Sequence, residues 1–270
     1  MKRTFLALLL GAVATTSMAH SPFVAPYSYL VDGENTGIVA GFAEQPFDSE
    51  IAIRGYDFKV INPNGEIKDL TLINSKAMSI ADIEAGQEGT YQVIGSRVGD
   101  IKYAKQGNRW LRVMNAEGDT LAPIAERNFI TPAEVNSKTQ QHTVKRYDQL
   151  SSFFTKKKVS KLNAPISNQG LNITFSEHPN HLSLAKPLSL KVSLNQKPAS
   201  NYQIELEKQP TSDLEKAELI TLVTNQQGEI ILPITAVGQY VVSVTSPEQK
   251  ATVKPNAESH RSILSFYVNP

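Results

Sequence analysis

The sequence has no cysteine among its 270 residues. This absence excludes disulfide bonds, iron–sulfur clusters, thiolate zinc sites and every mechanism that uses a cysteine nucleophile. The folded chain must therefore be stabilised by ordinary hydrophobic cores. Any metal site in it must be built from nitrogen and oxygen ligands.

An excess of charge of either sign is also lacking. The 27 Lys and Arg residues are almost balanced by 26 Asp and Glu residues, which leaves a net charge of +1. Proteins that bind nucleic acid or an anionic membrane surface typically have a basic face, so neither partner is expected. With 40% hydrophobic and 20% charged residues, the composition is that of a globular protein.

Several catalytic motifs are missing as well. The sequence has no Gly-x-Ser-x-Gly elbow, no phosphate-binding loop, no dinucleotide glycine fingerprint and no His-Glu-x-x-His zinc motif. Because no other acid–base arrangement is evident, we expect a binding protein rather than an enzyme.

Residues 1–19 have the pattern of a cleavable signal peptide. Lys2 and Arg3 precede a short apolar run, and Ser17 and Ala19 occupy the −3 and −1 positions of a cleavage site. The run is shorter than the ~20 residues of a membrane span, and no later run reaches that length. The sequence predicts a periplasmic, soluble mature chain without a membrane span, which begins at His20.

Most of the mature sequence has the pattern of short β-strands separated by turn residues. Strands are expected in the first half at Pro22–Tyr27, Thr36–Phe42, Tyr56–Ile61, Ile67–Ile73, Ala77–Ile80, Gly89–Ser96, Ile101–Lys105 and Trp110–Val113. In the second half they are expected at Leu171–Ser176, Leu188–Leu194, Tyr202–Glu207, Leu219–Thr224, Glu229–Ile234, Gln239–Val244 and Ser262–Val268. Seven strands in about a hundred residues indicate an immunoglobulin-like sandwich.

A Gly-x-Tyr-x-Val motif occurs once in each half, around Tyr91 and Tyr240. In sandwich domains a Tyr at this position folds back to bond a corner loop. The repeat predicts an all-β protein with two tandem immunoglobulin-like β-sandwich domains, at residues 20–165 and 166–270.

The segment Thr131–Gly170 is expected to contain the boundary between the domains. Thr131 and Pro132 favour a single helical turn, because Thr caps helices and Pro suits their first position. Gln149–Phe154 contains β-forming residues, and Lys156-Lys157-Lys158 is interpreted as a solvated face or a linker.

Histidines are the residues from which a metal site can be built. After cleavage, His20 offers an α-amine and an imidazole that can chelate one divalent ion together, although a His at this position can also be chance. Glu177-His178-Pro179-Asn180-His181 follows a predicted strand, and its side chains either converge on a metal or form a plain polar turn. His260 precedes the last predicted strand. Trp110 is either a sugar-stacking platform or, more commonly, a half-buried strand residue.

Four parts of the sequence carry a resemblance to a known family. They are His20–Pro26, Leu171–Pro179 with Leu184–Val192 and Asn195–Pro198, Thr224–Gly228 with Val237–Tyr240, and His260 with Ile263–Val268. They resemble the Ala-His-x-Phe/Tyr-x-x-x-Pro opening, the second-domain opening, the Gly-x-Tyr hairpin and the closing strand of a bacterial periplasmic family. That family is catalogued as a domain of unknown function and linked to the NikM-type periplasmic component of nickel/cobalt uptake. Gln196 departs from the family's Gly, and residues 50–165 match by strand pattern alone.

The resemblance implies two β-sandwich domains, a periplasmic location and a role with a transition metal. It supplies His20 and His260 as candidate ligands, to which the turn adds His178 and His181. We therefore expect a protein that binds Ni or Co, with Cu as the alternative ion, and that serves an inner-membrane metal importer or an outer-membrane receptor system.

Two other functions are compatible with the sequence. A tandem sandwich can be a structural or interaction module that binds a protein or glycan partner, around Trp110 or at the domain junction. An N-terminal His can also hold copper in an oxidative enzyme, which would require a second His close to His20 and an open coordination position.

Overall fold

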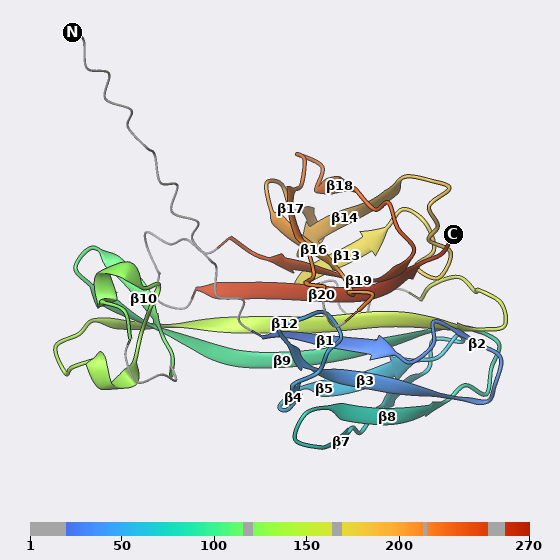
Figure 1. Cartoon of the computed structure of the whole chain (residues 1–270), viewed down its shortest axis with the longest axis horizontal. Helices are drawn as coiled ribbons and strands as arrows, with labels where there is room; N and C mark the ends of the chain where they lie inside the picture. Colours follow the sequence, from blue (N-terminus) through green and yellow to red (C-terminus); the bar gives the residue numbers. More distant parts are fainter. Residues whose placement is uncertain (1–19, 116–120, 164–168, 213–214, 248–256) are drawn as a thin grey trace, which may run out of the picture.

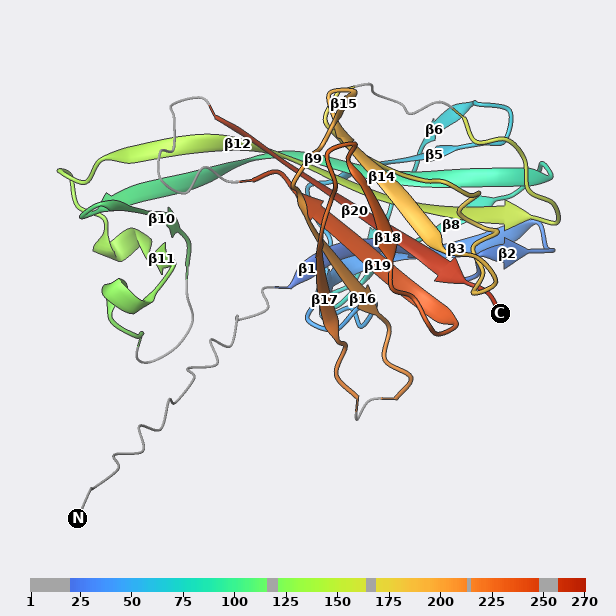
Figure 2. The same cartoon turned by 90° about the horizontal axis from the view of Figure 1, so that it is seen from above.

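The computed structural model describes residues 20–115, 121–163, 169–212, 215–247 and 257–270, and these ranges consist mainly of β-strands (Figures 1 and 2). The predicted all-β, sandwich-type fold class is thereby confirmed. The predicted leader and the predicted domain boundary at 165/166 lie outside the described residues. None of the helices in the described ranges is long and apolar enough to cross a membrane.

The strands range from two residues to the 18 residues of β9. The first half contains β1 (Ser21–Pro26), β2 (Leu30–Val31), β3 (Asn35–Ala43), β4 (Ile51–Ala52), β5 (Asp57–Ile61), β6 (Ile67–Asp69), β7 (Ile73–Asn74), β8 (Ser79–Glu84), β9 (Gly89–Gln106), β10 (Arg109–Val113), β11 (Phe129–Ile130) and β12 (Gln141–Lys156). The second half contains β13 (Leu171–Phe175), β14 (Leu188–Leu194), β15 (Lys197–Pro198), β16 (Gln203–Lys208), β17 (Leu219–Val223), β18 (Glu229–Leu232), β19 (Gly238–Thr245) and β20 (Glu258–Val268). Two single 3-10 turns, Ile124–Glu126 and Pro132–Glu134, complete the described elements.

Three sheets form three layers. The central sheet has the order β11-β10-β9-β12-β20-β19-β16-β17, with β2 and the β5–β6 pair beside it. A five-stranded sheet around β3 and β8 covers one face, and a four-stranded sheet around β14 covers the other (Figure 1). The two sandwiches therefore share the central sheet.

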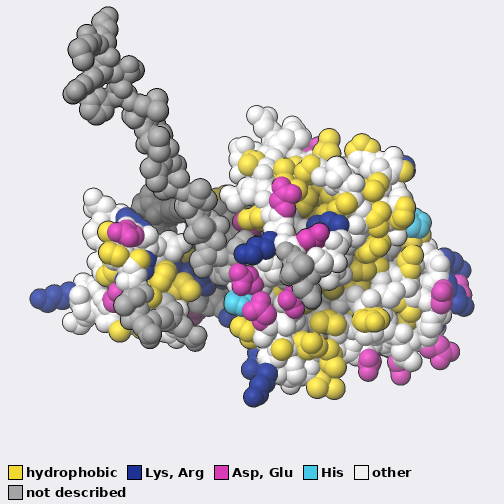
Figure 3. Space-filling model, viewed as in Figure 1, with side chains coloured by type: hydrophobic (Ala, Val, Ile, Leu, Met, Phe, Trp, Pro, Cys, Tyr) yellow, Lys and Arg dark blue, Asp and Glu magenta, His cyan; other side chains and the backbone are white. Residues whose placement is uncertain are grey.

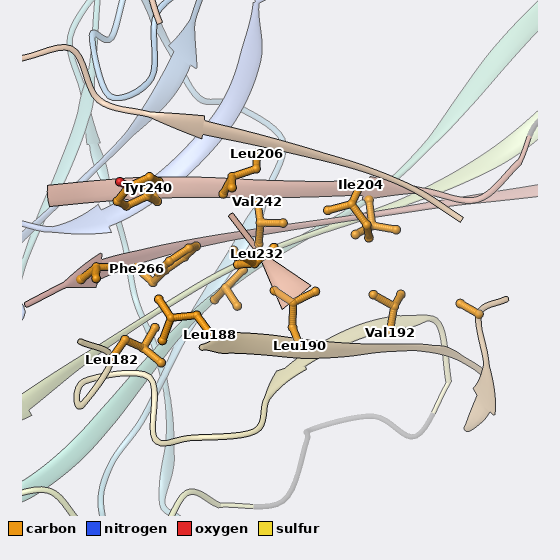
Figure 4. Close-up of a cluster of buried hydrophobic side chains, with 14 of the residues drawn as sticks. Leu182, Leu188, Leu190, Val192, Ile204, Leu206, Leu232, Tyr240, Val242 and Phe266 are labelled. Atoms are coloured by element: carbon orange, nitrogen blue, oxygen red, sulfur yellow. The ribbon is translucent and has the colours of Figure 1, made fainter. Parts of the chain in front are cut away.

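Side chains on the two faces of the central sheet pack into two separate hydrophobic cores. On β20, Ile263 packs in the cluster that faces β3 and β8, whereas Leu264 and Phe266 pack in the cluster that faces β14. Figure 4 shows this second cluster, in which Phe266 lies between Tyr240 and the leucines of the four-stranded sheet. Burial on both faces explains why the second half of β20, Ile263–Val268, is apolar or aromatic at every position except Ser265.

β12 is the main departure from the sequence prediction. The stretch interpreted as a boundary region forms a 16-residue strand that pairs antiparallel with β9 and parallel with β20. The prediction that Lys156 is solvated is wrong, because Lys156 is buried and its Nζ donates a hydrogen bond to the carbonyl of Ala85. Lys157 and Lys158 are exposed and lie beside Glu88.

β9 is also longer than expected. The two strands predicted at Gly89–Ser96 and Ile101–Lys105 are one continuous strand, because β12 pairs with it without a break from Gly89 to Ala104. The far end of β9 and β12 carries a small lobe with β10 and β11 (Figure 2).

The predicted helical turn at Thr131 is confirmed, and the Thr131 hydroxyl and backbone N–H both donate to Glu134.

Both predicted tyrosine corners are confirmed. The Tyr91 hydroxyl donates to the carbonyl of Gln87 at 2.9 Å, and the Tyr240 hydroxyl donates to the carbonyl of Ala236 at 2.7 Å. In each case the partner lies four residues upstream, which is the geometry of this motif in immunoglobulin-like sandwiches.

Candidate functional site

His20 immediately precedes β1, which pairs antiparallel with β3. The register places Ser21 opposite Ala43, so the loop that follows β3 passes beside His20. On the face shown in Figure 3, acidic and basic side chains are interspersed with hydrophobic ones over the described residues. The local partners of His20, rather than a broad charged surface, therefore determine its chemistry.

Glu50 is the partner of the His20 imidazole. The Nε2 atom of His20 lies 2.9 Å from Oε2 of Glu50, and the other carboxylate oxygen accepts the backbone N–H of Glu44 at 3.1 Å. The hydrogen bond from His20, followed by that from Glu44, lowers the pKa of the Glu50 carboxyl. An ionised carboxylate only accepts hydrogen bonds, so Nε2 carries the proton and Nδ1 of a neutral His20 keeps its lone pair.

His178 occupies a different position, in the turn after β13. Its Nε2 atom lies 3.1 Å from both the Thr90 hydroxyl and the Ser160 carbonyl, and its Nδ1 accepts the backbone N–H of Asn180. The Asn180 side chain in turn bonds Thr155 and the carbonyl of Phe153. Nε2 thus fastens the turn to the start of β9 and to the segment after β12, and Nδ1 stabilises the turn itself.

His181 lies next to this network. Its ring is 5.7 Å from the ring of His178 between centroids, and its side chain is exposed. The turn therefore brings two of the predicted ligands together. The nitrogens of His178 are already hydrogen-bonded, which favours the plain polar turn among the two interpretations of this segment.

The pKa of His178 predicts an effect of pH on stability. Burial, and then the positive charge of His181, lower this pKa below that of a free imidazole, against a hydrogen bond to Ser160 that raises it. The unfolded chain then binds the proton more readily, so stability is complete above the ordinary value of about 6.5 and is lost as the pH falls below it.

We expect the melting temperature of the chain to fall between pH 7.5 and pH 5.5, and the His178→Gln variant to fall less over the same interval. Thermal unfolding followed by circular dichroism measures both. His181→Gln should fall by an intermediate amount, because it removes the neighbouring positive charge but keeps the burial and the hydrogen bonds of His178. Equal decreases in the chain and in His178→Gln would show that His178 does not contribute.

His260 lies on β20, opposite Tyr147 of β12 in the register, and its ring stacks on that of Tyr147 at 4.9 Å. Its Nε2 is 3.6 Å from a carboxylate oxygen of Glu258. The ring is buried, which is typical of a packed core histidine.

Trp110 is half-buried in β10, as expected for a strand residue, and packs against the ring of His142.

The predicted ligands thus have separate surroundings: His20 pairs with Glu50, His260 stacks on Tyr147, and His178 and His181 share a turn. Within the part of the chain that the structure describes, no three His, Asp or Glu side chains are grouped to hold a metal ion. The sequence pattern does not identify Glu50 as a site residue, because Asp48-Ser49-Glu50 is typical of a turn. Only the pairing of β1 with β3 brings Glu50 to His20.

The fold and these side chains define an all-β protein of immunoglobulin-like sandwiches, with a histidine–carboxylate pair where β1 begins. The chain belongs to the DUF4198 family, which is described as a domain of unknown function and whose model matches residues 17–248. No curated protein matches the sequence.

Three solved structures are among those that match the chain. A tetra-tandem repeat from the extending region of a large adhesion protein is 9% identical, with 93% of this chain and 74% of that chain covered and a TM-score of 0.22. A DUF4785 family protein from Legionella pneumophila is 10% identical, with 82% and 51% covered and a TM-score of 0.23. The D0-D1 domain of intimin is 12% identical, with 90% and 97% covered and a TM-score of 0.21. The chain spans about half the length of the Legionella protein.

Proposed function

We propose that the chain is exported to the periplasm, that its leader is removed after Ala19, and that the new N-terminus binds a divalent transition metal. The observation that carries this proposal is the 2.9 Å contact between Nε2 of His20 and Glu50. Histidines that bind metals commonly donate their other ring N–H to a carboxylate, which fixes the ring and makes it more basic. Glu50 stands in that position relative to His20.

Two nitrogen ligands would come from one residue. Cleavage after Ala19 would free the α-amine of His20, and this amine together with Nδ1 would form a chelate. Nitrogen ligands of this kind suit Ni, Co and Cu, and the chain has no thiolate to compete for the ion. His20 is partly exposed, with 39% of its side chain accessible, so a metal could be taken up and released without unfolding.

The resemblance of the sequence to a family linked to NikM-type proteins supports a more specific proposal. A NikM-type role in nickel or cobalt uptake would have the protein deliver its ion to an inner-membrane importer or to an outer-membrane receptor system. His20 and Glu50 support metal binding without catalysis. A chelate of two nitrogens, held in place by one carboxylate, retains an ion but supplies no acid–base pair for a reaction.

Replacement of His20 by Ala should weaken metal binding by mature protein at least about tenfold, and Glu50→Gln should weaken it by about tenfold, the scale on which the loss of a supporting carboxylate acts. Isothermal calorimetry with nickel, cobalt and copper salts measures both. Asp48→Asn, which removes a neighbouring exposed carboxylate, is the matched control. The double variant His178→Gln/His181→Gln should retain full affinity. Unchanged affinity in His20→Ala would contradict the arrangement.

The alternative function, a structural or interaction module for a protein or glycan partner, predicts no metal affinity in any of these variants. The same titrations therefore discriminate between the two functions.

A further inference from the structure

A cavity of about 390 Å³ lies where the two sandwiches meet, between the loop after β3 and the face of β16 and β17 that points away from the four-stranded sheet. One wall is apolar. Phe23 and Phe47 meet edge to face at 5.5 Å, and Leu219 and Val241 extend this wall on the central sheet. A hydrogen bond from the backbone N–H of Ala217 to Gln45 joins the two sides close by.

The polar side chains that line the cavity include three carboxylates. Glu205 and Glu207 alternate with the core residues Ile204 and Leu206 on β16, so both carboxylates project from the opposite face of the strand. Glu44 contributes the third, from the loop after β3. Among the described residues that line the cavity, none is Lys or Arg.

Glu207 is the residue that needs a partner. Its Oε1 atom is buried and has no hydrogen-bond partner among the described residues. Burial, and then the charge of Glu205, raise its pKa to about 7. A buried carboxylate without a partner is unfavourable, whereas Glu205 accepts a hydrogen bond from the side chain of Gln203 at 3.3 Å.

We propose that this cavity binds a small organic cation, a protonated amine with an apolar body. The ammonium group would pair with the partly buried carboxylate of Glu207, and the apolar body would lie against Phe23, Phe47 and Val241. A bare metal ion fits less well, because much of the wall is hydrocarbon. The amine site is distinct from the metal site proposed at His20 and does not require a free N-terminus.

The test uses hexylamine as the probe, with hexan-1-ol as its uncharged analogue, titrated by calorimetry into the full mature chain without metal. Hexylamine should bind with an affinity at least ten times that of hexan-1-ol. Glu207→Gln should abolish at least nine-tenths of this preference. Glu229→Gln, which changes an exposed glutamate on β18 outside the cavity, is the matched control and should leave it intact.

A second variant tests the location. Thr221 lines the cavity from β17 and is exposed, so Thr221→Trp should be tolerated and should weaken hexylamine binding at least tenfold by filling the space. Thermal unfolding confirms that each variant is folded, and Glu207→Gln should melt above the parent at pH 8, where it removes a partly buried charge. Equal binding of amine and alcohol, no binding of either, or full amine affinity in Glu207→Gln would overturn the proposal.

Discussion

Replacement of Asp148 by Ala is expected to lower the free energy of unfolding by about 3 kcal/mol, the scale of a broken buried ion pair. Asp148 is buried on β12 and lies opposite Arg261 of β20 in the register. The Arg261 guanidinium donates to both carboxylate oxygens, at 2.9 and 3.1 Å, and the Tyr56 hydroxyl donates to one of them. Removal of the carboxylate leaves a largely buried guanidinium without its acceptor.

Urea denaturation followed by tryptophan fluorescence and circular dichroism measures this loss. Asp69→Ala is the control, because Asp69 pairs with Lys59 but 84% of its side chain is exposed, and exposed pairs contribute less than about 1 kcal/mol. A loss in Asp148→Ala no larger than that in Asp69→Ala would show that the ion pair between β12 and β20 does not stabilise the shared sheet.

Gly228→Ala is expected to be about as damaging, with a loss of roughly 3 kcal/mol. Gly228 has φ +75°, and a Cβ atom there would lie 2.3 Å from the carbonyl oxygen of Val192 and 3.0 Å from the backbone nitrogen of Ala199. The left-handed conformation alone costs about 1–2 kcal/mol for an L-residue. The backbone contacts add an overpacking cost of about 1–3 kcal/mol, because the neighbouring strand cannot yield as a flexible side chain would.

Gly55→Ala separates the two contributions. Gly55 has nearly the same φ, +73°, but nothing lies within 4 Å of its hypothetical Cβ atom. We expect the loss in Gly228→Ala, measured by urea denaturation, to exceed that in Gly55→Ala by at least about 1 kcal/mol. Equal losses would mean that the turn relaxes away from Val192.

Local patterns predicted the parts of the fold that depend on neighbouring residues. Strand composition located most of the strands, and the Gly-x-Tyr-x-Val repeat predicted both tyrosine corners. The same reasoning recognised β-forming residues at Gln149–Phe154 but missed the rest of β12, because its first half is polar and its central position depends on pairing with β9 and β20, which are distant in the sequence. Lys156 was misjudged for the same reason.

The residues of the candidate sites also differ in whether local sequence patterns could predict them. His20 could be singled out from the cleavage pattern alone. Its partner Glu50 could not, because 30 residues separate them and only the antiparallel pairing of β1 with β3 closes that distance. The alternation of Glu205 and Glu207 with buried residues is typical of a strand with one solvated face. Only the packing of the loop after β3 covers these two carboxylates.

The most direct test of the metal proposal compares two forms of the mature protein by calorimetric titration with nickel, cobalt and copper. One form begins at His20, and the other carries an added N-terminal Gly-Ser that removes the free amine from His20. The proposal predicts micromolar or tighter binding of at least one of these ions to the first form and its loss in the second. Equal affinity in both forms, or no binding to the form that begins at His20, would contradict it.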